Sequence, residues 1–377
     1  MPGYELINYK ERNAVNKLFK EGGVLFAHGF DNLRKKYHVR EFENKCEKYF
    51  KIKKCLAVSS GTAAIKIGLK ALGVKEGDEV ITQAFNFIAT IEAILDLKAR
   101  PIIVNVNNTL NMDPNELEKS ITKKTKVVIP VHMLGFSAQM SEIQKICRKK
   151  NIKILEDNCE SVGAKYNNKF LGTLGHMGIF SFDHGKILTT GEGGLLLTNN
   201  FKLDKYVREY HDHGHENNPK FSRGKDTRSI YGFNYRMTEL QGVIGKVQLT
   251  KLKFILKNNK LRYEALNQLI RNKFEIRKSP KKSIPNYDTF IFFEKNTNNR
   301  KKILKKISQH NFGTKNLPDA INWHCSAYWN HALPSKEVKK SLKTKKILSS
   351  AIAIPINLKR SVKDYKKLAK SIISINK

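Results

Sequence analysis

The sequence is poor in cysteine and has no long apolar stretch. Its 377 residues include five cysteines, and none of them forms a C-x-x-C pair. An odd number of cysteines without paired spacing argues against a disulfide framework and against a zinc ribbon. No run of 18 or more apolar residues occurs, so we expect no membrane-spanning helix. The first residues lack the basic stretch and apolar block of a secretion signal, which predicts a cytoplasmic protein.

Acidic residues are also scarce, with 34 against 70 basic residues and a formal net charge of +36. Such an excess attracts nucleic acid, anionic lipid or acidic metabolites. Arginine, which grips phosphate through two parallel hydrogen bonds, is much rarer here than lysine, and no helix-turn-helix, RRM or zinc-finger pattern is present. We therefore interpret the charge as a solvated lysine-rich surface and expect no nucleic-acid partner. Binding to nucleic acid is the alternative.

Short apolar runs alternate with helical patterns over the first 200 residues, which predicts an α/β fold. The expected strands are residues 55–58, 79–82, 101–106, 127–131, 152–156, 178–182 and 194–198. Helical patterns at 62–72, 89–97 and 140–149 lie between them, so we expect a largely parallel sheet covered on both faces. The length favours two domains. We place a large domain at 1–250 and a smaller α+β domain at 251–377.

Ligands of such sheets bind at the carboxyl ends of the strands, and two of these ends carry small or acidic residues. Gly61 and Thr62 follow the strand 55–58 and open a helix, where backbone amides and the helix dipole favour an anion. An ordinary turn capped by Thr62 is the alternative. Asp157 follows the strand 152–156, where a buried carboxylate is costly unless it is paired. A helix N-cap is the alternative for Asp157.

Two further strand ends carry a lysine and an aromatic residue. Lys186 follows the strand 178–182 and precedes the glycine-rich turn 191–194. A lysine held in a desolvated pocket can become a nucleophile that binds a carbonyl compound covalently. A solvated surface lysine is the alternative. Phe87 follows the strand 79–82 and can stack on a flat ring, although phenylalanine in this context is most often part of the core.

Taken together and in this order, these motifs resemble the DegT/DnrJ/EryC1/StrS sugar aminotransferases, a branch of the fold-type I enzymes that depend on pyridoxal 5'-phosphate (PLP). The resemblance covers nearly the whole chain. It is carried by Ser60-Gly61-Thr62-Ala63-Ala64, Val131-His132-Met133-Leu134-Gly135, Glu156-Asp157, Leu171-Gly172-Thr173, Phe180-Ser181-Phe182 with Lys186, Thr190-Gly191-Glu192-Gly193-Gly194, and Asn234-Tyr235-Arg236-Met237-Thr238-Glu239-Leu240-Gln241.

The resemblance implies PLP as cofactor and a fold-type I transferase with a mixed, mostly parallel sheet. Lys186 matches the lysine that binds the cofactor covalently, and Asp157 matches the carboxylate that keeps the pyridine nitrogen protonated. Phe87 matches the aromatic residue that stacks on the ring. Relatives that dehydrate sugars replace the lysine by histidine, so Lys186 favours amino transfer over dehydration.

The family pattern also implies how the phosphate is held and how subunits assemble. Gly61, Thr62 and Ser181 match the phosphate cradle. Asn234 matches a residue that reaches the phosphate from the neighbouring subunit, which implies a homodimer with shared active sites. The sequence departs from the family at Glu160, where Gln or His is usual near the phenolic oxygen of the cofactor.

Further segments are similar to one subgroup, the 8-amino-3,8-dideoxy-manno-octulosonate transaminases. These segments are residues 1–6, 30–34, 40–43, 212–215, 322–324 and 329–331. The similarity implies transfer from glutamate to C8 of an oxidised 3-deoxy-manno-octulosonate for lipopolysaccharide biosynthesis. A nucleotide-linked keto-sugar is the alternative acceptor, and a sugar dehydratase or a non-catalytic regulator is the alternative activity.

Three residues outside the cofactor motifs are candidate substrate contacts: His132, Trp323 and His324. Trp323 and His324 can instead cap the small domain. An anionic acceptor would also suit the basic candidates Arg34, Arg40, Arg223 and Arg228. The alternating histidines of residues 211–215 have no obvious fourth ligand, so we expect a polar loop there and no metal site.

Overall fold

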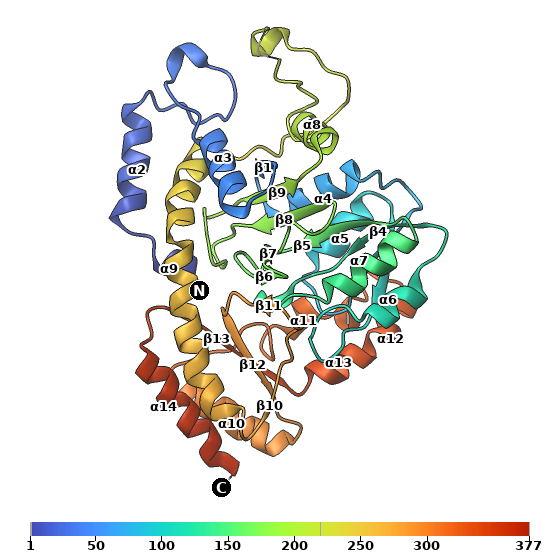
Figure 1. The fold of residues 1–377 in the computed structure, drawn as a ribbon, viewed down its shortest axis with the longest axis vertical. Helices are drawn as coiled ribbons and strands as arrows, with labels where there is room; N and C mark the ends of the chain where they lie inside the picture. Colours follow the sequence, from blue (N-terminus) through green and yellow to red (C-terminus); the bar gives the residue numbers. More distant parts are fainter. Residues whose placement is uncertain (1, 219, 377) are drawn as a thin grey trace.

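A seven-stranded mixed sheet forms the centre of the computed structural model, which describes residues 2–218 and 220–376 (Figure 1). Its strand order is β1-β9-β8-β5-β4-β2-β3. The strands are β1 (Lys54–Val58), β9 (Gly194–Thr198), β8 (Met177–Ser181), β5 (Lys153–Asp157), β4 (Thr125–Ile129), β2 (Glu79–Gln83) and β3 (Arg100–Val104). Only β9 runs antiparallel to its neighbours, so the sheet is mostly parallel.

Helices cover both faces of this sheet because its strands are apolar on both sides. In β1, Leu56 and Val58 pack into the core beneath α4 (Gly61–Ala71), whereas Cys55 and Ala57 pack on the opposite face against α3 (His38–Phe50). Such near-continuous apolar strands are typical of buried parallel sheets. The other flanking helices are α5 (Ala89–Asp96), α6 (Pro114–Ser120), α7 (Met140–Lys149) and α8 (Phe201–Tyr210).

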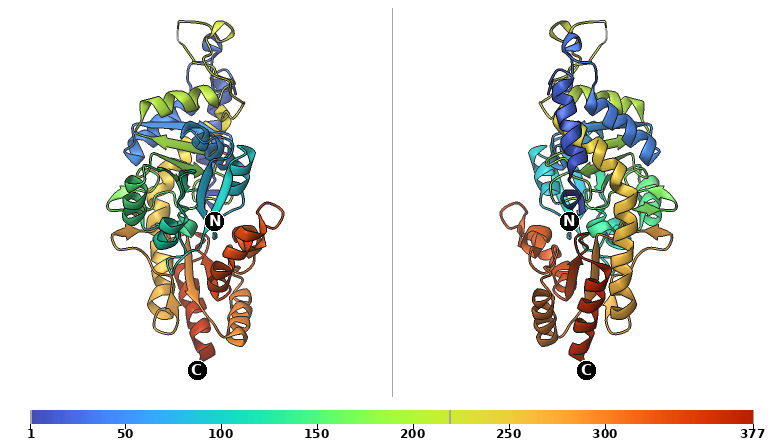
Figure 2. Two further views of the ribbon diagram at one scale, coloured as in Figure 1. Left: turned by 90° about the vertical axis from the view of Figure 1, so that its right-hand side faces the viewer. Right: turned by 90° about the vertical axis from the view of Figure 1, so that its left-hand side faces the viewer.

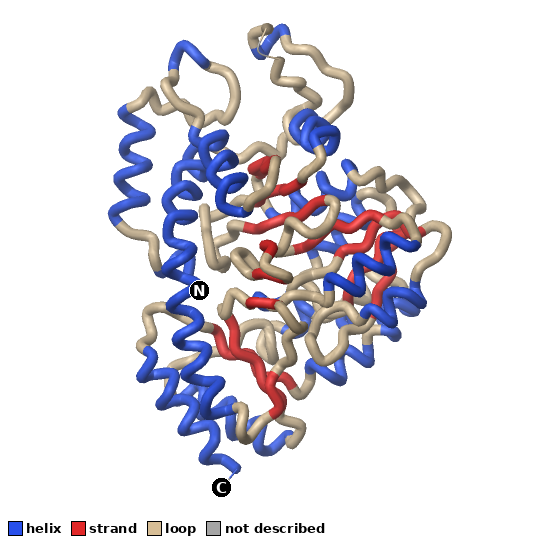
Figure 3. The backbone as a smooth tube through the Cα atoms, viewed as in Figure 1, coloured by secondary structure: helices blue, strands red, loops and turns tan. Residues whose placement is uncertain are grey.

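A second, smaller sheet lies toward the C-terminus, separated from the large one and flanked by helices (Figure 3). It is antiparallel and consists of β10 (Glu275–Ile276), β12 (Thr289–Phe293) and β13 (Ala351–Pro355). Its apolar residues pack against α10 (Thr297–Gln309) and α14 (Val362–Ile373). A third sheet joins β11 (Ser283–Ile284) to β6 (Lys165–Tyr166) and β7 (Lys169–Phe170), and so links the two regions.

The helix α9 (Glu239–Ile270) runs from the large sheet to the small one (Figure 2). Thr238 caps its N-terminus in a capping box with Gln241. Its first part packs closely on α3, because a Cβ atom at Gly242 would lie 2.8 Å from the backbone of Val39. Its last part packs on α14. The expected domain boundary at 250/251 falls inside this helix, and the division into two domains stays a prediction.

Part of the chain beyond residue 251 packs against the large sheet. This segment contains α11 (Ile321–His324), α12 (Ser335–Lys340) and α13 (Leu342–Leu348). Trp329 is buried beside Ile103 of β3, and the carboxylate of Glu337 accepts the backbone N–H of Ile103 at 2.8 Å. The segment therefore brings C-terminal residues to the edge of the large sheet.

The N-terminal region contributes α1 (Pro2–Glu5) and α2 (Tyr9–Lys20), and α2 packs alongside α9. Glu11 of α2 accepts hydrogen bonds from Gln248 and Lys251 of α9. In the described ranges, no helix combines the length and the hydrophobicity that a bilayer crossing requires. All seven strands expected from the sequence are present, within two residues at most of their expected ends.

Candidate active site

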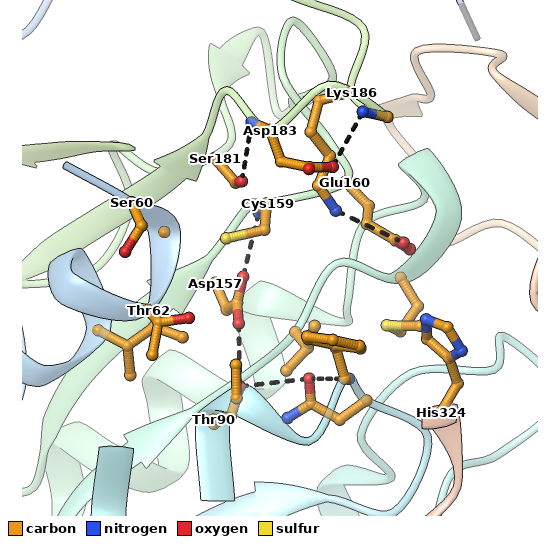
Figure 4. A pocket seen from close by; sticks show the side chains of 18 of the residues that line it. Ser60, Thr62, Thr90, Asp157, Cys159, Glu160, Ser181, Asp183, Lys186 and His324 are labelled. Atoms are coloured by element: carbon orange, nitrogen blue, oxygen red, sulfur yellow. Dashed lines mark hydrogen bonds and ion pairs between the residues drawn. The ribbon is translucent and has the colours of Figure 1, made fainter. Parts of the chain in front are cut away.

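A cavity of about 400 Å³ lies at the carboxyl ends of the strands, where the sequence predicts the ligand site (Figure 4). Its walls come from the segments that follow β1, β2, β5 and β8, and from residues 315–324 of the C-terminal region. Lys186, Asp157 and Phe87 all line it, together with Gly61, Thr62 and Ser181. The structure therefore brings most of the predicted cofactor residues into one cavity.

One end of the cavity is formed by the N-terminus of α4. The hydroxyl of Ser60 caps this helix by accepting the N–H of Ala63 at 3.1 Å. No described residue accepts a hydrogen bond from the backbone amides of Gly61 and Thr62. Free amides at a helix N-terminus, beside the hydroxyls of Thr62 and Ser181, suit a phosphate group.

Gly61 is required for the close packing at this end. A Cβ atom added at Gly61 would lie 2.9 Å from Cβ of Ser181 and 3.2 Å from Sγ of Cys159. The neighbouring turn is equally tight, because a Cβ atom at Gly194 would lie 2.3 Å from the carbonyl oxygen of Ser60. The two glycines let β8, β9 and the start of α4 approach closely enough to form the cradle.

Asp157 is a buried carboxylate at the end of β5, with only 4% of its surface exposed. It accepts the hydroxyl of Thr90 at 3.2 Å and the backbone N–H of Cys159 at 3.0 Å. Burial raises the pKa of Asp157, because a carboxylate in an apolar setting loses its hydration. A cation placed against it would favour the ionised form, so this position suits a protonated ring nitrogen.

Lys186 lies in the turn between β8 and β9 and points into the cavity (Figure 4). Its backbone N–H donates to the carbonyl oxygen of Asp183 at 3.0 Å, and the side chain of Asp183 accepts the N–H of Gly185 at 2.9 Å. Nζ of Lys186 lies 3.9 Å from Oε1 of Glu160. A primary amine and a buried carboxylate thus share one cavity.

The outer wall of the cavity carries Phe87 and His324. Phe87 is 47% exposed, and its ring centroid lies 5.4 Å from that of His324. Nδ1 of His324 donates to the carbonyl oxygen of Ala320 at 2.8 Å. Burial lowers the pKa of His324, which favours the neutral ring. His324, one of the three candidate substrate contacts, therefore lines the cavity.

The structure does not bring His132 to the cavity. His132 is fully buried, and its Nδ1 accepts the N–H of Ala138 at 2.9 Å while its Nε2 lies 3.2 Å from Glu156. Glu156 in turn accepts the N–H of Gly172 at 2.9 Å. Both ring nitrogens are thus engaged within the protein, so His132 orients Glu156 rather than a substrate in this arrangement.

Several other candidates also lie outside the cavity lining. Trp323 is 62% exposed at the surface, and Asn234 is exposed on the loop after α8, where its side chain accepts the N–H of Arg236 at 3.4 Å. None of the four basic candidates for binding an anionic acceptor lines the cavity of this chain: Arg34, Arg40, Arg223 and Arg228. Arg223 instead pairs with the buried Asp212, and Arg236 pairs with the same carboxylate.

The cavity also contains residues that sequence reasoning missed. Thr90, Cys159, Lys315 and Asn316 line it. Thr90 and Cys159 stand next to motifs that the sequence does reveal, since they follow Phe87 and Asp157 closely. Lys315 and Asn316 lie between α10 and α11 without any local motif, so only the folded structure identifies them.

The residues present fit PLP. A phosphate cradle, a buried carboxylate suited to a ring nitrogen, and an amine able to bind an aldehyde line one cavity. On this fold, such a set defines the class of fold-type I PLP-dependent transferases. The model of the DegT/DnrJ/EryC1/StrS aminotransferase family matches residues 28–373, and the chain belongs to this family.

Relatives and solved structures agree with this assignment. GDP-perosamine synthase of Caulobacter vibrioides is 38% identical over 215 residues, which cover 57% of this chain and 57% of that protein. The uncharacterized protein MJ1066 of Methanocaldococcus jannaschii is 32% identical over 290 residues, or 73% of this chain and 74% of that one. The crystal structure of 3-amino-5-hydroxybenzoic acid synthase superposes with a TM-score of 0.86 at 25% identity, covering 100% of this chain and 98% of that chain.

Several sequence predictions are confirmed by these findings. The chain belongs to a family of PLP-dependent aminotransferases, as its motifs predict, and it has the fold-type I architecture. PLP is the cofactor of this class. The chain spans 57% of the length of the GDP-perosamine synthases of Caulobacter vibrioides and Escherichia coli O157:H7 that it matches.

Proposed function

We propose that the protein is an aminotransferase that uses PLP to carry an amino group from glutamate to the carbonyl carbon of a sugar. The observation that carries the proposal is the convergence of Lys186, Asp157 and the N-terminus of α4 on one cavity. Each of the three lies at the end of a different strand or in the segment after it, so their meeting depends on the whole fold rather than on one motif.

In the proposed reaction, the residues of this chain bind the cofactor and move protons. Gly61, Thr62 and Ser181 hold the phosphate, and Asp157 holds a proton on the ring nitrogen. Bound PLP supplies an electron sink for the carbon that loses its proton. Nζ of Lys186 would bind the cofactor covalently. Once released, it would take a proton from the α-carbon of the amino donor and pass that proton to a carbon of the bound cofactor.

Phe87 covers the outer side of the cavity, where it is placed to stack on the cofactor ring. His324, whose ring lies against Phe87, is the candidate contact for the sugar. Because burial keeps His324 neutral, it can donate or accept a hydrogen bond with a sugar hydroxyl. His132 and Trp323 are not part of this proposal, since neither lines the cavity.

Two acceptors have separate support. The GDP-perosamine synthases of Caulobacter vibrioides and Escherichia coli O157:H7, at 38% and 36% identity, favour a nucleotide-linked keto-sugar. The segments 1–6, 30–34, 322–324 and 329–331 favour an oxidised octulosonate, aminated at C8 for lipopolysaccharide biosynthesis. We place the nucleotide-linked keto-sugar first, because relatives named for synthesis of a GDP-linked sugar match more than half of this chain.

The test is an assay of purified protein with glutamate and each acceptor in turn, with 2-oxoglutarate formation as the readout. The protein should be yellow with PLP, and glutamate should bleach that absorbance. A deoxygenated sugar without net amination would show a dehydratase instead. Absence of any spectral response to glutamate would favour a non-catalytic regulator and contradict the proposal.

We further propose that the protein acts as a homodimer in the cytoplasm. Asn234 lies on an exposed loop outside the cavity of its own chain, which suits a residue that serves a neighbouring subunit. Light scattering of the purified protein would test the dimer. Mixing Asn234→Ala subunits with Lys186→Ala subunits would test sharing, because only a shared site restores one intact active site per mixed dimer.

A further inference from the structure

Glu160 is a largely buried carboxylate that faces the proposed reactive lysine. Only 11% of its side chain is exposed, and its Oε1 lies 3.9 Å from Nζ of Lys186 (Figure 4). It also stands where the sequence departs from the family pattern. The proposed reaction assigns it no role, although an ionised group at this position acts directly on the Lys186 amine.

The surrounding chain holds Glu160 in place. Its Oε2 accepts the backbone N–H of Leu134 at 3.0 Å, and its Oε1 accepts the side-chain amide of Asn316 at 3.3 Å. Leu134 and Gly135 both have positive φ, at 52° and 83°, in the short helical turn Met133–Gly135. Leucine rarely adopts this conformation, so the turn is maintained by its surroundings.

Asn286 fixes the same turn from the C-terminal region. Its backbone N–H donates to the carbonyl oxygen of Gly135 at 3.2 Å, and its side chain donates to the carbonyl oxygen of Glu160 at 3.0 Å. A Cβ atom at Gly135 would lie 1.8 Å from Oδ1 of Asn286. The position of Glu160 is therefore determined from both sides of the cavity.

The charge of Glu160 is balanced by Lys186. Burial acts to raise the pKa of Glu160, but the charges of Lys186 and Lys315 outweigh it and lower that pKa to about 2. Lys315 has its own carboxylate partner, since its Nζ donates to Asp288 at 2.7 Å. In the described part of the chain, Lys186 makes no other ion pair, so Lys186 and Glu160 are each other's charge partner.

This ion pair weakens when Lys186 becomes covalently bound, because the ammonium group with its three N–H donors is replaced by an imine nitrogen that carries at most one proton. To attack an aldehyde carbon, the Lys186 ammonium releases its proton to solvent. Nζ then forms a C=N bond to the aldehyde carbon, and the aldehyde oxygen leaves as water. Pyridoxamine phosphate, the aminated form of the cofactor, has no carbonyl group. Lys186 therefore stays beside Glu160 when that form is bound.

We propose that Glu160 is the positioning residue of Lys186, which stabilises the free lysine and so favours pyridoxamine phosphate over PLP. The inference rests on the proposed function, because it requires Lys186 to be the residue that binds the cofactor. If Glu160 stabilises the free lysine, it also affects how readily Lys186 is released from the cofactor when the amino donor binds.

The test compares dissociation constants of PLP and pyridoxamine phosphate for cofactor-free protein, measured by titration calorimetry for wild type and Glu160→Gln. Glutamine keeps the shape and removes the charge. The ratio of the two constants should shift toward PLP by about tenfold, the size expected for loss of one charge-assisted contact. Circular dichroism of each variant verifies folding, and Glu160→Ala should shift the ratio in the same direction.

Two matched controls separate the direct contact from a general charge effect. Glu192→Gln removes an equal charge from the lining of the same cavity and should leave the ratio unchanged. In a Lys186→Ala background, Glu160→Gln should no longer alter the ratio, since the coupled partner is gone.

An unchanged ratio in Glu160→Gln would overturn the inference, as would an equal shift in Glu192→Gln or one that persists without Lys186. These outcomes leave the proposed function standing if wild type still transfers amino groups. Failure of wild type to bind either form would overturn both.

Discussion

The two ends of the cavity are built in different ways. At the phosphate end, Ser60, Gly61 and Thr62 are consecutive residues at the start of one helix, and Ser181 ends a neighbouring strand. At the other end, Glu160 is held by Leu134 and Asn316, which are separated by nearly half of the chain. The first end depends on local backbone geometry, whereas the second depends on how the C-terminal region packs against the large sheet.

This difference implies that the two ends of the cavity have different functions. In the proposed function, the cradle of backbone amides binds the same phosphate in every state of the reaction, so we expect it to tolerate little change. An assembly of side chains from distant segments can differ between relatives without disturbing that cradle. We therefore expect substitutions at the phosphate end to affect cofactor binding, and substitutions at the Glu160 end to affect the balance between cofactor states.

Lys186→Ala should have the largest effect, because Lys186 binds the cofactor in the proposed function and also lies beside Glu160. Without the amine, no covalent bond to the cofactor forms, and amino transfer should fall by about 10³-fold or more. Borohydride reduction followed by mass spectrometry measures the bond, and 2-oxoglutarate formation measures transfer. Lys186→Arg keeps the charge beside Glu160 and should be equally inactive; turnover within tenfold of wild type in either variant would contradict the assignment.

Asp157→Asn should lower the turnover rate by roughly 10²-fold, since a neutral amide no longer stabilises a protonated ring nitrogen. Burial raises the pKa of Asp157, which means that the ionised carboxylate destabilises the folded, cofactor-free protein. The melting temperature of that protein should therefore not fall when Asp157 is replaced by asparagine. Steady-state kinetics and thermal unfolding give the two readouts. A large loss of stability with unchanged kcat would assign Asp157 a structural role instead.

Gly61→Ala should weaken PLP binding by roughly tenfold, because the added Cβ lies 2.9 Å from Cβ of Ser181 and must displace the cradle. Pyridoxal, which lacks the phosphate, provides the matched control. Its affinity should change much less than that of PLP when both are titrated into cofactor-free protein. Equal losses for the two ligands would show that the phosphate does not bind at this end.

The smallest expected effect is the pH dependence of stability at the Glu160 end. The folded state lowers the pKa of Glu160 from an ordinary value of 4.5 to about 2. Its contribution to the free energy of unfolding is therefore present above pH 4.5 and lost as the pH falls toward 2. Calorimetry should find Glu160→Gln a few degrees less stable than wild type at neutral pH, with the gap closing in acid. A gap independent of pH would contradict the ion pair with Lys186.

The phosphate end and the sheet could be predicted from the sequence because their signals are local. Asp157 ends the apolar strand β5, and Gly61 and Lys186 lie in the segments that follow β1 and β8, and the sheet brings such strand ends together whatever the details of packing. His132 also follows a strand, yet its ring turns away to Ala138 and Glu156. Position in the chain gives the strand end but not the direction of the side chain.

Only part of the Glu160 end could be predicted. The motif that contains Asp157 also indicates Glu160, three residues further on, as a residue near the cofactor, and Glu160 does line the cavity. Lys315 and Asn316 carry no motif, and they reach the cavity only because the small sheet packs beside the large one. The expected boundary at 250/251 lies inside α9, a single helix that packs on α3 near its start and on α14 near its end. An amphipathic pattern indicates such a helix, but it does not show which neighbours its two ends contact.

The continuity of α9 has a consequence for how such an enzyme can change over time. Its 32 residues give the small sheet and the N-terminal helices a common axis. Tilting the small sheet about that axis would move Asn316 relative to Glu160, but it would leave the spacing of Asp157 and Lys186 intact, since Asp157 ends β5 and Lys186 lies in the turn between β8 and β9 of the large sheet. Substitutions that alter this packing can therefore accumulate between relatives and reshape the surroundings of Glu160, while Asp157 and Lys186 are inherited at a constant separation.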